Sequence, residues 1–506
     1  MASSKKGKTA KKGAKNGKVA FNADLLPVDL FCQLAYMSSL ATSHLPRNLL
    51  FDYSARMPYT SSRYFKDVNF MAKQLNYDYS EACRKVGERT KETEPKALLL
   101  RMSGALSSGE TEADFLQREA FVLGEKYGED YERRVESLKR WTDTYVALIL
   151  SAALIVVISV VSMLIFPQSP TMIALLTWVM LISTGLGAWV MYRASPKETK
   201  THNLANTSRL QSLAQSLFKL VALPACAVIL CIAVLMKLEL GLSAILLSLA
   251  MGPVGFLAYW NDKQIDKLDN EIASFTRSLG GIAKAIGSTI TEALGRMDQD
   301  AMGALKPGVR NLVSTLAFGI NPEFCWRKFV EDTGSEQVNR TIRIFWDGIA
   351  VGGDPGKVGG LSSMFALKVS LLREKRNMVA TSFSYICLTM HAILVLLLVG
   401  IYNILLNFST AIASAAPKGQ EGMDAIASLP TFAFFAGGGA QLQVLNLMVT
   451  AMVLMLTAVD AMAIKVVEGG SNLKILYYLG LTLMLTGLCL TLVPGVVERM
   501  FSTLKF

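Results

Sequence analysis

The sequence predicts an all-α polytopic membrane protein, with seven transmembrane helices and two cytoplasmic helical bundles related by duplication. Three observations predict this fold. First, 52% of the 506 residues are hydrophobic and only 18% are charged, below the roughly 25% of a soluble protein. Second, nearly all charge falls within residues 1–144 and 261–380, and the rest holds apolar runs long enough to cross a bilayer. Third, the two charged segments share short motifs in the same order.

Seven apolar stretches have the length of a transmembrane helix, roughly 17 to 25 residues. Four of them make up the block 145–260, and three lie in the block 381–506. Their predicted bounds are 145–166, 171–192, 220–236, 240–260, 381–405, 442–461 and 475–494.

Basic residues predict the orientation, because Lys and Arg favour the cytoplasmic side. With a cytoplasmic N-terminus, all but four of the 51 basic residues lie inside, the exceptions being Lys237, Lys418, Arg499 and Lys505. The C-terminus is then extracellular. An external loop is expected near 406–440, where Asn407-Phe408-Ser409 is a candidate glycosylation sequon at Asn407.

Two segments outside the spans hold similar numbers of acidic and basic residues, so neither predicts a nucleic-acid surface. They are the cytoplasmic modules 21–144 and 261–380. Residues 1–20 carry seven Lys and predict a disordered basic tail. This tail is either simply solvated or attracted to anionic membrane lipids.

The two modules predict a duplication. Residues 80–86 resemble residues 322–329, and residues 101–110 resemble residues 345–354, at a nearly constant offset. Asn321-Pro322-Glu323 has the residues of a helix start. Helices of the first module are expected near 28–42, 46–56, 60–75, 80–91, 95–108 and 111–143.

The last helix of each module is expected to run without a break into a membrane span, at 145 and at 381. Such a helix would transmit a push or a twist from the module to the bilayer. The charged residues on these two coupling helices are Arg133, Arg134, Lys139, Arg140, Arg373, Lys375 and Arg376.

A Gly-acid turn occurs near the end of each module. The first contains Gly104, Gly109 and Glu110, and the second contains Gly348, Gly352, Gly353 and Asp354. Gly109 and Gly353 are predicted to end a helix in the left-handed conformation, and Gly104 and Gly348 to allow close helix approach. The residues serve either the folding of a tight helical hairpin or contact with a partner such as an ATPase.

No catalytic or cofactor site is predicted. The nearest phosphate-loop match, ending at Gly356-Lys357, lacks the first Gly and the final hydroxyl. The three His are scattered, and no Cys pair has zinc spacing. Within the spans only Asp460 and His391 are ionisable, and His391 is expected to stand alone, which argues against an ion or solute pathway.

The modules resemble the F family of type II secretion and type IV pilus assembly. Residues 286–294 are similar to that family's early Ala-Leu segment, Asn321 to Phe329 to its later helix, and Val351 to Asp354 to its Gly-acid turn. Glu323 to Phe324 depart from the small residue usual there, and the first module lacks the Ala-Leu segment. The order of module, four spans, module and three spans most resembles the archaeal FlaJ-type platform.

The resemblance implies a non-enzymatic platform in the cytoplasmic membrane, without cofactor. A separate hexameric ATPase docks on such modules, and pilin or archaellin-like subunits join a growing filament beside the spans. We also expect a homo-oligomer, namely a dimer. Alternatives are the platform of a Tad-type secretion or adhesion pilus, a membrane receptor or scaffold, and a transporter.

Overall fold

The computed structural model describes residues 22–165, 170–202, 208–298, 300–415 and 439–503. The regular structure of these residues is helical, apart from one isolated bridge between Thr201 and Ser335. The all-α class is therefore confirmed. The predicted tail 1–20 and most of the predicted loop 406–440 lie outside the described residues.

The chain divides into two compact units, each described here by itself. The first unit holds Met1–Gly124 and Asp347–Asp354, and the second holds Glu125–Trp346 and Pro355–Phe506. The bounds predicted for the two cytoplasmic modules stay a prediction.

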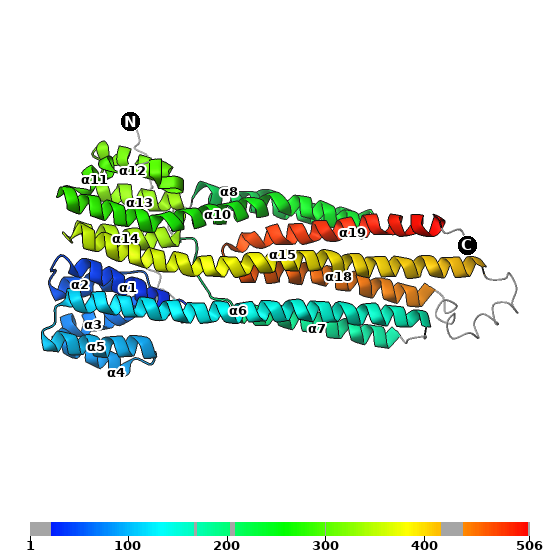
Figure 1. Cartoon of the computed structure of the whole chain (residues 1–506), viewed down its shortest axis with the longest axis horizontal. Coiled ribbons are helices and arrows are strands. Elements are labelled where there is room, and N and C mark those ends of the chain that lie inside the picture. Colours follow the sequence, from blue (N-terminus) through cyan, green and yellow to red (C-terminus); the bar gives the residue numbers. More distant parts are fainter. Residues whose placement is uncertain (1–21, 166–169, 203–207, 299, 416–438, 504–506) are drawn as a thin grey trace, which may run out of the picture. The chain divides into compact units, whose positions relative to one another are not determined.

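The first unit contains six helices at the places predicted from the sequence, with bounds that agree within about two residues (Figure 1). They are α1 (Leu26–Ala41), α2 (Arg47–Ala55), α3 (Ser62–Gln74), α4 (Tyr79–Arg89), α5 (Thr93–Ser108) and the start of α6 (Glu112–Ile165). As predicted, α6 continues without a break from the polar segment into the first apolar stretch.

Helix α1 forms the centre of the first unit, since nearly all of its side chains are buried. Two of its buried polar side chains bond the chain that follows it. Gln33 donates to the carbonyl oxygen of Ser54 at 2.7 Å, and Asp29 accepts from the Thr60 N–H at 2.9 Å. These bonds offset the cost of burying polar groups and fix the loop after α2.

The second unit contains the other helices. They are α7 (Pro170–Ala194), α8 (Arg209–Leu217), the π-helix η1 (Phe218–Ala222), α9 (Leu223–Leu235), α10 (Leu240–Ile286), α11 (Ile290–Arg296), η2 (Asp300–Leu305), α12 (Lys306–Ala317), α13 (Pro322–Thr333), α14 (Glu336–Ala350), α15 (Pro355–Ala415), α18 (Gly439–Glu468), η3 (Asn472–Lys474) and α19 (Ile475–Thr503). The last residues of α14 belong to the first unit.

Five helical segments of the described chain are long and apolar enough to cross a membrane, so the chain is a membrane protein. They overlap the predicted spans 220–236, 240–260, 381–405, 442–461 and 475–494, and only residue 236 and residues 442–444 fall outside them. The remaining two, 145–166 and 171–192, lie on α6 and α7, with residue 166 outside the described residues, and they stay predictions.

The predicted external loop is corrected at its start. Residues 406–415 continue α15 instead of leaving it, and Asn407 donates through its amide to the carbonyl oxygen of Asn403 at 2.9 Å. The apolar run simply has no helix breaker at 405. The candidate sequon therefore lies on a helix.

Helices α10 and α19 pack closely along a seam of small residues (Figure 1). Gly241, Ser248 and Gly255 recur every seven residues on α10 and face α19. A Cβ at Gly255 would lie 2.2 Å from the Tyr477 backbone nitrogen, and Ser248 donates to the carbonyl oxygen of Gly480 at 2.7 Å. Small residues let membrane helices approach this closely, so dispersion contacts and hydrogen bonds hold them together.

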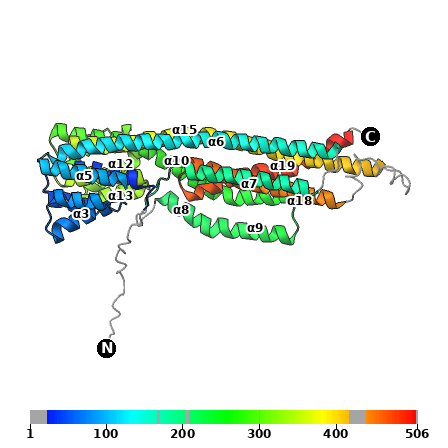
Figure 2. The ribbon, with the colours of Figure 1, turned by 90° about the horizontal axis from the view of Figure 1, so that it is seen from below.

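Helix α9 is the opposite case, because none of its side chains is buried. Figure 2 shows it at the outside of the group formed by α10, α18 and α19. Val234 is 78% exposed and Leu235 is 81% exposed. Such a helix fits a membrane, where lipid covers its apolar side chains.

The polar half of α10 packs against α13, α14 and α15. Ile272, Phe275 and Leu279 on this half are buried, and Phe275 contacts Trp326 of α13. At Gly280, α10 comes so close to the start of α15 that a Cβ would lie 2.3 Å from the carbonyl oxygen of Pro355.

Gly280→Ala should therefore destabilise the protein, while Gly281→Ala should not. A methyl group at position 280 meets backbone that cannot move aside, so we expect a loss of about 1–3 kcal/mol in the free energy of unfolding. Position 281 has open space around it, and Ala there should be neutral or stabilising by up to about 1 kcal/mol. Thermal unfolding of both variants in detergent measures the difference. Equal stabilities would contradict the close approach of α10 and α15.

Candidate functional site

The first Gly-acid turn, at the end of α5, has the predicted geometry. Gly109 ends the helix in the left-handed conformation with φ of 77°. The N–H of Glu110 donates to the carbonyl oxygen of Ala105 at 3.2 Å, which satisfies the end of the helix. Gly104 differs from the prediction, because it is exposed and a Cβ there would meet no described atom within 4 Å. It permits no close helix contact.

The second turn, at the end of α14, corrects the predicted position by one residue. Gly352, and not Gly353, is left-handed, with φ of 90°. The N–H of Gly353 donates to the carbonyl oxygen of Gly348 at 2.9 Å. In this motif the left-handed residue immediately precedes that donor, so the position falls on Gly352. Gly109 and Gly352 are thus the corresponding residues.

Both turns belong to the first unit, although they come from the two predicted modules. Asp347, just before the second turn, accepts a hydrogen bond from the hydroxyl of Tyr36 on α1 at 3.0 Å. Gly348 is buried beside it, and Asp354 ends the segment. The described contacts give the turns a folding role, and partner contact stays a prediction.

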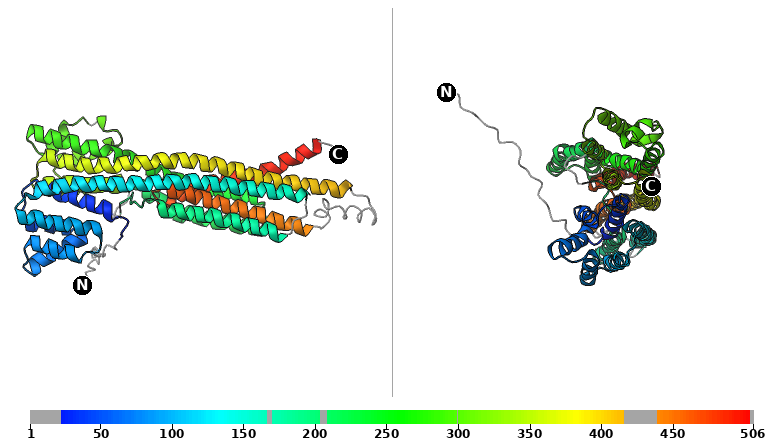
Figure 3. Two further views of the ribbon diagram at one scale, coloured as in Figure 1. Left: turned by 60° about the horizontal axis from the view of Figure 1, so that its bottom comes forward. Right: turned by 90° about the vertical axis from the view of Figure 1, so that its left-hand side faces the viewer.

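The two coupling helices, α6 and α15, lie side by side within the second unit (Figure 3). Lys368 pairs with Glu125 at 2.9 Å, and Lys375 pairs with Glu132 at 2.5 Å. Glu132 lies seven residues after Glu125 on α6, and Lys375 lies seven residues after Lys368 on α15. The numbering rises together along both helices, so they run in the same direction. Between the pairs, Tyr131 and other apolar side chains of both helices form a small buried cluster.

The basic side chains predicted on α6 point elsewhere. Arg133, Arg134, Lys139 and Arg140 are exposed. Arg133 pairs with the nearby Asp130, and Arg140 pairs with Glu136 at 2.6 Å. Exposed pairs one turn apart contribute little to stability. The acidic residues of α6, rather than its basic ones, contact α15.

Glu198 joins both coupling helices to the segment that follows α7. Its carboxylate accepts from Arg373 Nε at 2.7 Å, lies 3.6 Å from Arg376 Nη1, and accepts from the hydroxyl of Tyr131. Burial alone would raise the pKa of Glu198, but the guanidinium groups of Arg373 and Arg376 lower it below its ordinary value. The carboxylate is therefore held ionised.

Arg373 and Arg376 extend this ionic cluster to further helices. Arg373 pairs with Asp269 of α10 at 2.6 Å, and Arg376 donates to the carbonyl oxygen of Val467 near the end of α18 at 3.0 Å. Arg376 is 6% exposed. Such a buried guanidinium needs all of these acceptors, so the cluster fixes α15 where it approaches the membrane.

Glu198→Gln should lower the free energy of unfolding by about 3 kcal/mol near neutral pH, because the buried guanidinium of Arg376 loses its carboxylate and that of Arg373 keeps only Asp269. The folded-state pKa of Glu198 is below its ordinary value of 4.5, so its contribution is present above that pH and is lost as pH falls. The two proteins should therefore converge in stability as pH falls below 4.5 and passes through the folded-state pKa of Glu198. Glu136→Gln, on an exposed pair, should change stability by less than about 1 kcal/mol. Unfolding in detergent at several pH values measures both, and a difference independent of pH would contradict the ionic role.

A second polar cluster lies inside the apolar part of the helices, and it corrects the prediction that His391 stands alone. Asp460 of α18 accepts from the hydroxyl of Tyr145 on α6 at 2.8 Å, and its other oxygen lies 2.9 Å from His391 Nδ1 on α15. His391 Nε2 lies 3.0 Å from Thr486 Oγ1 on α19. Asp460 is fully buried, and Tyr145 and His391 are each 1% exposed.

Asp460 thus contacts both coupling helices through one carboxyl group. An ionisable group is costly to bury among apolar helices, and the hydrogen bonds to Tyr145 and His391 offset that cost. In the second unit, α6 and α15 are joined three times: by the Lys–Glu pairs, by Glu198 and by Asp460.

The sequence analysis did not predict the acidic residues that join α6 to α15. They are Glu125, Glu132, Glu198 and Asp460. One available signal was the spacing of seven between Glu125 and Glu132, which matches that between Lys368 and Lys375 on the other coupling helix. No comparable signal exists for Asp460, because its partners are brought together only by packing.

Two curated archaeal proteins match the chain in sequence. The Flagella accessory protein J of Methanocaldococcus jannaschii is 24% identical over 307 residues, which are 59% of this chain and 55% of that protein. The chain is similar to Flagella accessory protein J. The protein of the same name from Methanococcus voltae is 23% identical over 332 residues, 63% of this chain and 59% of that protein.

These alignments confirm the resemblance to FlaJ-type proteins that the sequence motifs indicate. The chain spans a little over half the length of the two relatives that it matches. No family model matches the chain, and no solved structure matches it.

Proposed function

We propose that this chain is a cytoplasmic-membrane platform for assembly of an archaellum or a related type IV pilus-like filament. The similarity to Flagella accessory protein J carries this proposal. Two continuous helices, each polar in its first half and apolar in its second, support it. Such helices connect a soluble module mechanically to the membrane.

In this mechanism a separate hexameric ATPase docks on the cytoplasmic modules and moves them. The displacement travels along α6 and α15 into the membrane, where Asp460 joins both helices. Pilin or archaellin-like subunits then move from the membrane into the filament beside the platform. The chain itself hydrolyses no ATP, binds no cofactor and acts as a homodimer.

We also propose that the two modules arose by duplication and that seven helices cross the membrane. The pairs Glu125–Lys368 and Glu132–Lys375 support the duplication, because each joins residues 243 positions apart. Gly109 and Gly352, the two left-handed turn residues, share this offset. Corresponding residues face each other when a two-fold axis lies between two parallel helices, as at a symmetric dimer interface.

The proposed topology places the N-terminus in the cytoplasm and the C-terminus outside. In a cysteine-free background, Lys237→Cys should react with a membrane-impermeant maleimide in intact cells, and Arg193→Cys should react only after permeabilisation. Both side chains are exposed, at opposite predicted sides of the membrane. The reverse pattern of labelling would overturn the orientation.

Deletion of the gene in its host tests the function. We expect loss of one class of surface filament, with restoration by the wild-type gene, and electron microscopy with subunit identification shows whether that filament is an archaellum or an adhesion pilus. Purified protein should show no ATP hydrolysis but should bind the host's secretion-type hexameric ATPase. Unchanged filaments in the deletion strain would refute the proposal.

A further inference from the structure

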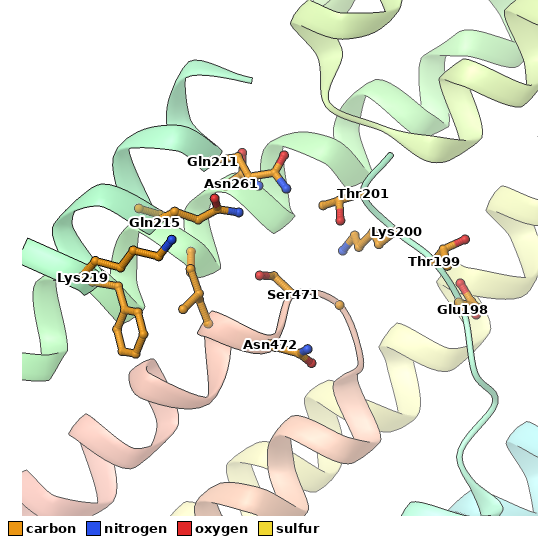
Figure 4. A pocket seen from close by; sticks show the side chains of 15 residues that line it. Glu198, Thr199, Lys200, Thr201, Gln211, Gln215, Lys219, Asn261, Ser471 and Asn472 are labelled. Carbon is orange, nitrogen blue, oxygen red and sulfur yellow. The ribbon is translucent and has the colours of Figure 1, made fainter. Parts of the chain in front are cut away.

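An open pocket of about 620 Å³ lies in the second unit, at the level where three predicted spans meet their polar flanks (Figure 4). Lys219 immediately precedes the span at 220, Asn261 immediately follows the span ending at 260, and Asn472 lies just before the span at 475. The pocket therefore lies at the polar boundary of the membrane, the layer that lipid headgroups occupy.

Several polar side chains line this pocket without a protein partner. Asn261 is only 5% exposed, yet its amide makes no hydrogen bond within the described chain. The buried Oε1 atom of Gln211 has no partner there either. Buried polar atoms are nearly always hydrogen-bonded, so the Gln211 Oε1 atom calls for a donor. The Asn261 amide lines the open pocket and can both donate and accept. The two side chains fit a ligand that carries hydroxyl groups.

Positive charge lines the pocket on two sides. Lys219 is exposed and forms no ion pair with the described residues. Lys200, drawn on the other side in Figure 4, is 12% exposed and pairs with Asp266 at 2.7 Å. The ammonium group of Lys200 has three N–H donors, so it can still donate a hydrogen bond to a ligand in the pocket. The one acidic side chain among the described lining residues, Glu198, is bound by arginines. Asp262 and Asp266 lie nearby and both pair with Lys200, which leaves Lys219 as the lining cation without an ion pair in the described chain.

An apolar cluster adjoins the pocket on the side of the spans. Leu473 lines the pocket and packs on the buried Ala222, Val254 and Leu476. Pro224 lacks an N–H, and the preceding π-helix η1 places Phe218 at the pocket and connects directly to α9. Because α9 has no buried side chain, an acyl chain can run along it toward the membrane interior. The ligand is thus anionic and hydroxylated at one end and apolar at the other.

We propose that this pocket binds the headgroup of an anionic phospholipid whose headgroup carries hydroxyl groups. Lys219 and Lys200 contact the phosphodiester, and Asn261 and Gln211 hydrogen-bond the hydroxyls. This site fixes α8 and α9 against α10 and α19 at the membrane surface. The inference goes beyond filament assembly and does not depend on it.

Lipid binding to the full chain, reconstituted in phosphatidylcholine nanodiscs, tests the proposal. Phosphatidylglycerol is the probe, and Lys219→Gln is the main variant. We expect phosphatidylglycerol to be retained in preference to phosphatidylcholine, and Lys219→Gln to weaken that preference about ten-fold through loss of a charge-assisted contact. Lys237→Gln, the matched control at the other end of α9, should bind like the wild type.

Asn261→Leu is a second variant, and it should keep the fold. Phosphatidic acid lacks the glycerol hydroxyls of the phosphatidylglycerol headgroup. The variant should therefore show a smaller preference for phosphatidylglycerol over phosphatidic acid than the wild type does. A competition arm with soluble glycerol 3-phosphate identifies the source of the phosphate. Displacement of the lipid by equimolar glycerol 3-phosphate would overturn the proposal in favour of a soluble ligand. Equal lipid preference in wild type, Lys219→Gln and Lys237→Gln would overturn it entirely.

Discussion

Asp460→Ala should destabilise the membrane helices strongly and abolish filament assembly. The carboxyl group of Asp460 is the shared partner of the Tyr145 hydroxyl and of His391 Nδ1. Its removal leaves these two atoms unpaired where no water can replace it, although His391 Nε2 keeps Thr486. Each buried polar atom left unpaired costs about 1–3 kcal/mol. Thermal unfolding in detergent measures the stability, and complementation of a deletion strain measures assembly.

Two further variants separate stability from coupling. Tyr145→Phe removes one hydrogen bond and should cost about 1 kcal/mol. The triple variant Asp460→Leu, His391→Leu and Tyr145→Phe, called the apolar variant below, replaces all three polar partners by apolar side chains and should recover most of the stability. Assembly should still fail in the apolar variant, because α6 and α15 no longer share a carboxyl group. Normal filaments in a stable apolar variant would show that the cluster has no part in coupling.

Local chemistry explains why the sequence predicted the helices so closely. Asn321 accepts the N–H of Glu323 at 2.9 Å and starts α13 at Pro322, as its residue types indicate. The left-handed position in the second turn was misplaced by one residue. Because positions 352 and 353 are both glycine, residue type does not indicate which of them takes the left-handed conformation. The hydrogen bond from the Gly353 N–H to Gly348 decides for Gly352.

The partners across helices were much harder to predict. Hydropathy indicates that a segment enters the membrane, but not which of its faces meets which neighbour. His391 and Asp460 are 69 residues apart and meet only because α15 and α18 pack together. The contacts of the basic residues of α6 were equally hard to predict. Their charge indicates a cytoplasmic segment, but it does not indicate which side of the helix they occupy.

Insertion of Gly-Gly after Lys375 should abolish filament assembly while leaving membrane insertion and ATPase binding intact. Two added residues rotate the rest of α15 by about 200°. Lys368–Glu125 and Lys375–Glu132 then stay in register, whereas Arg376 turns away from Glu198 and His391 from Asp460. The two glycines also cost about 1 kcal/mol each in helix propensity, which adds flexibility where the helix was continuous.

The matched control for the insertion in α15 is the same Gly-Gly insertion after Lys418, beyond the end of α15 at Ala415. It leaves every described contact of α15 in place, so filaments should form normally. Lys375→Met tests the exposed pair with Glu132 alone and should reduce stability by less than about 1 kcal/mol. If α15 carries displacement as a rigid element, only the insertion after Lys375 stops assembly, with protein levels and ATPase binding unchanged. Filaments of wild-type length in that strain would mean that displacement reaches the membrane through α6 alone, or that no helix carries it.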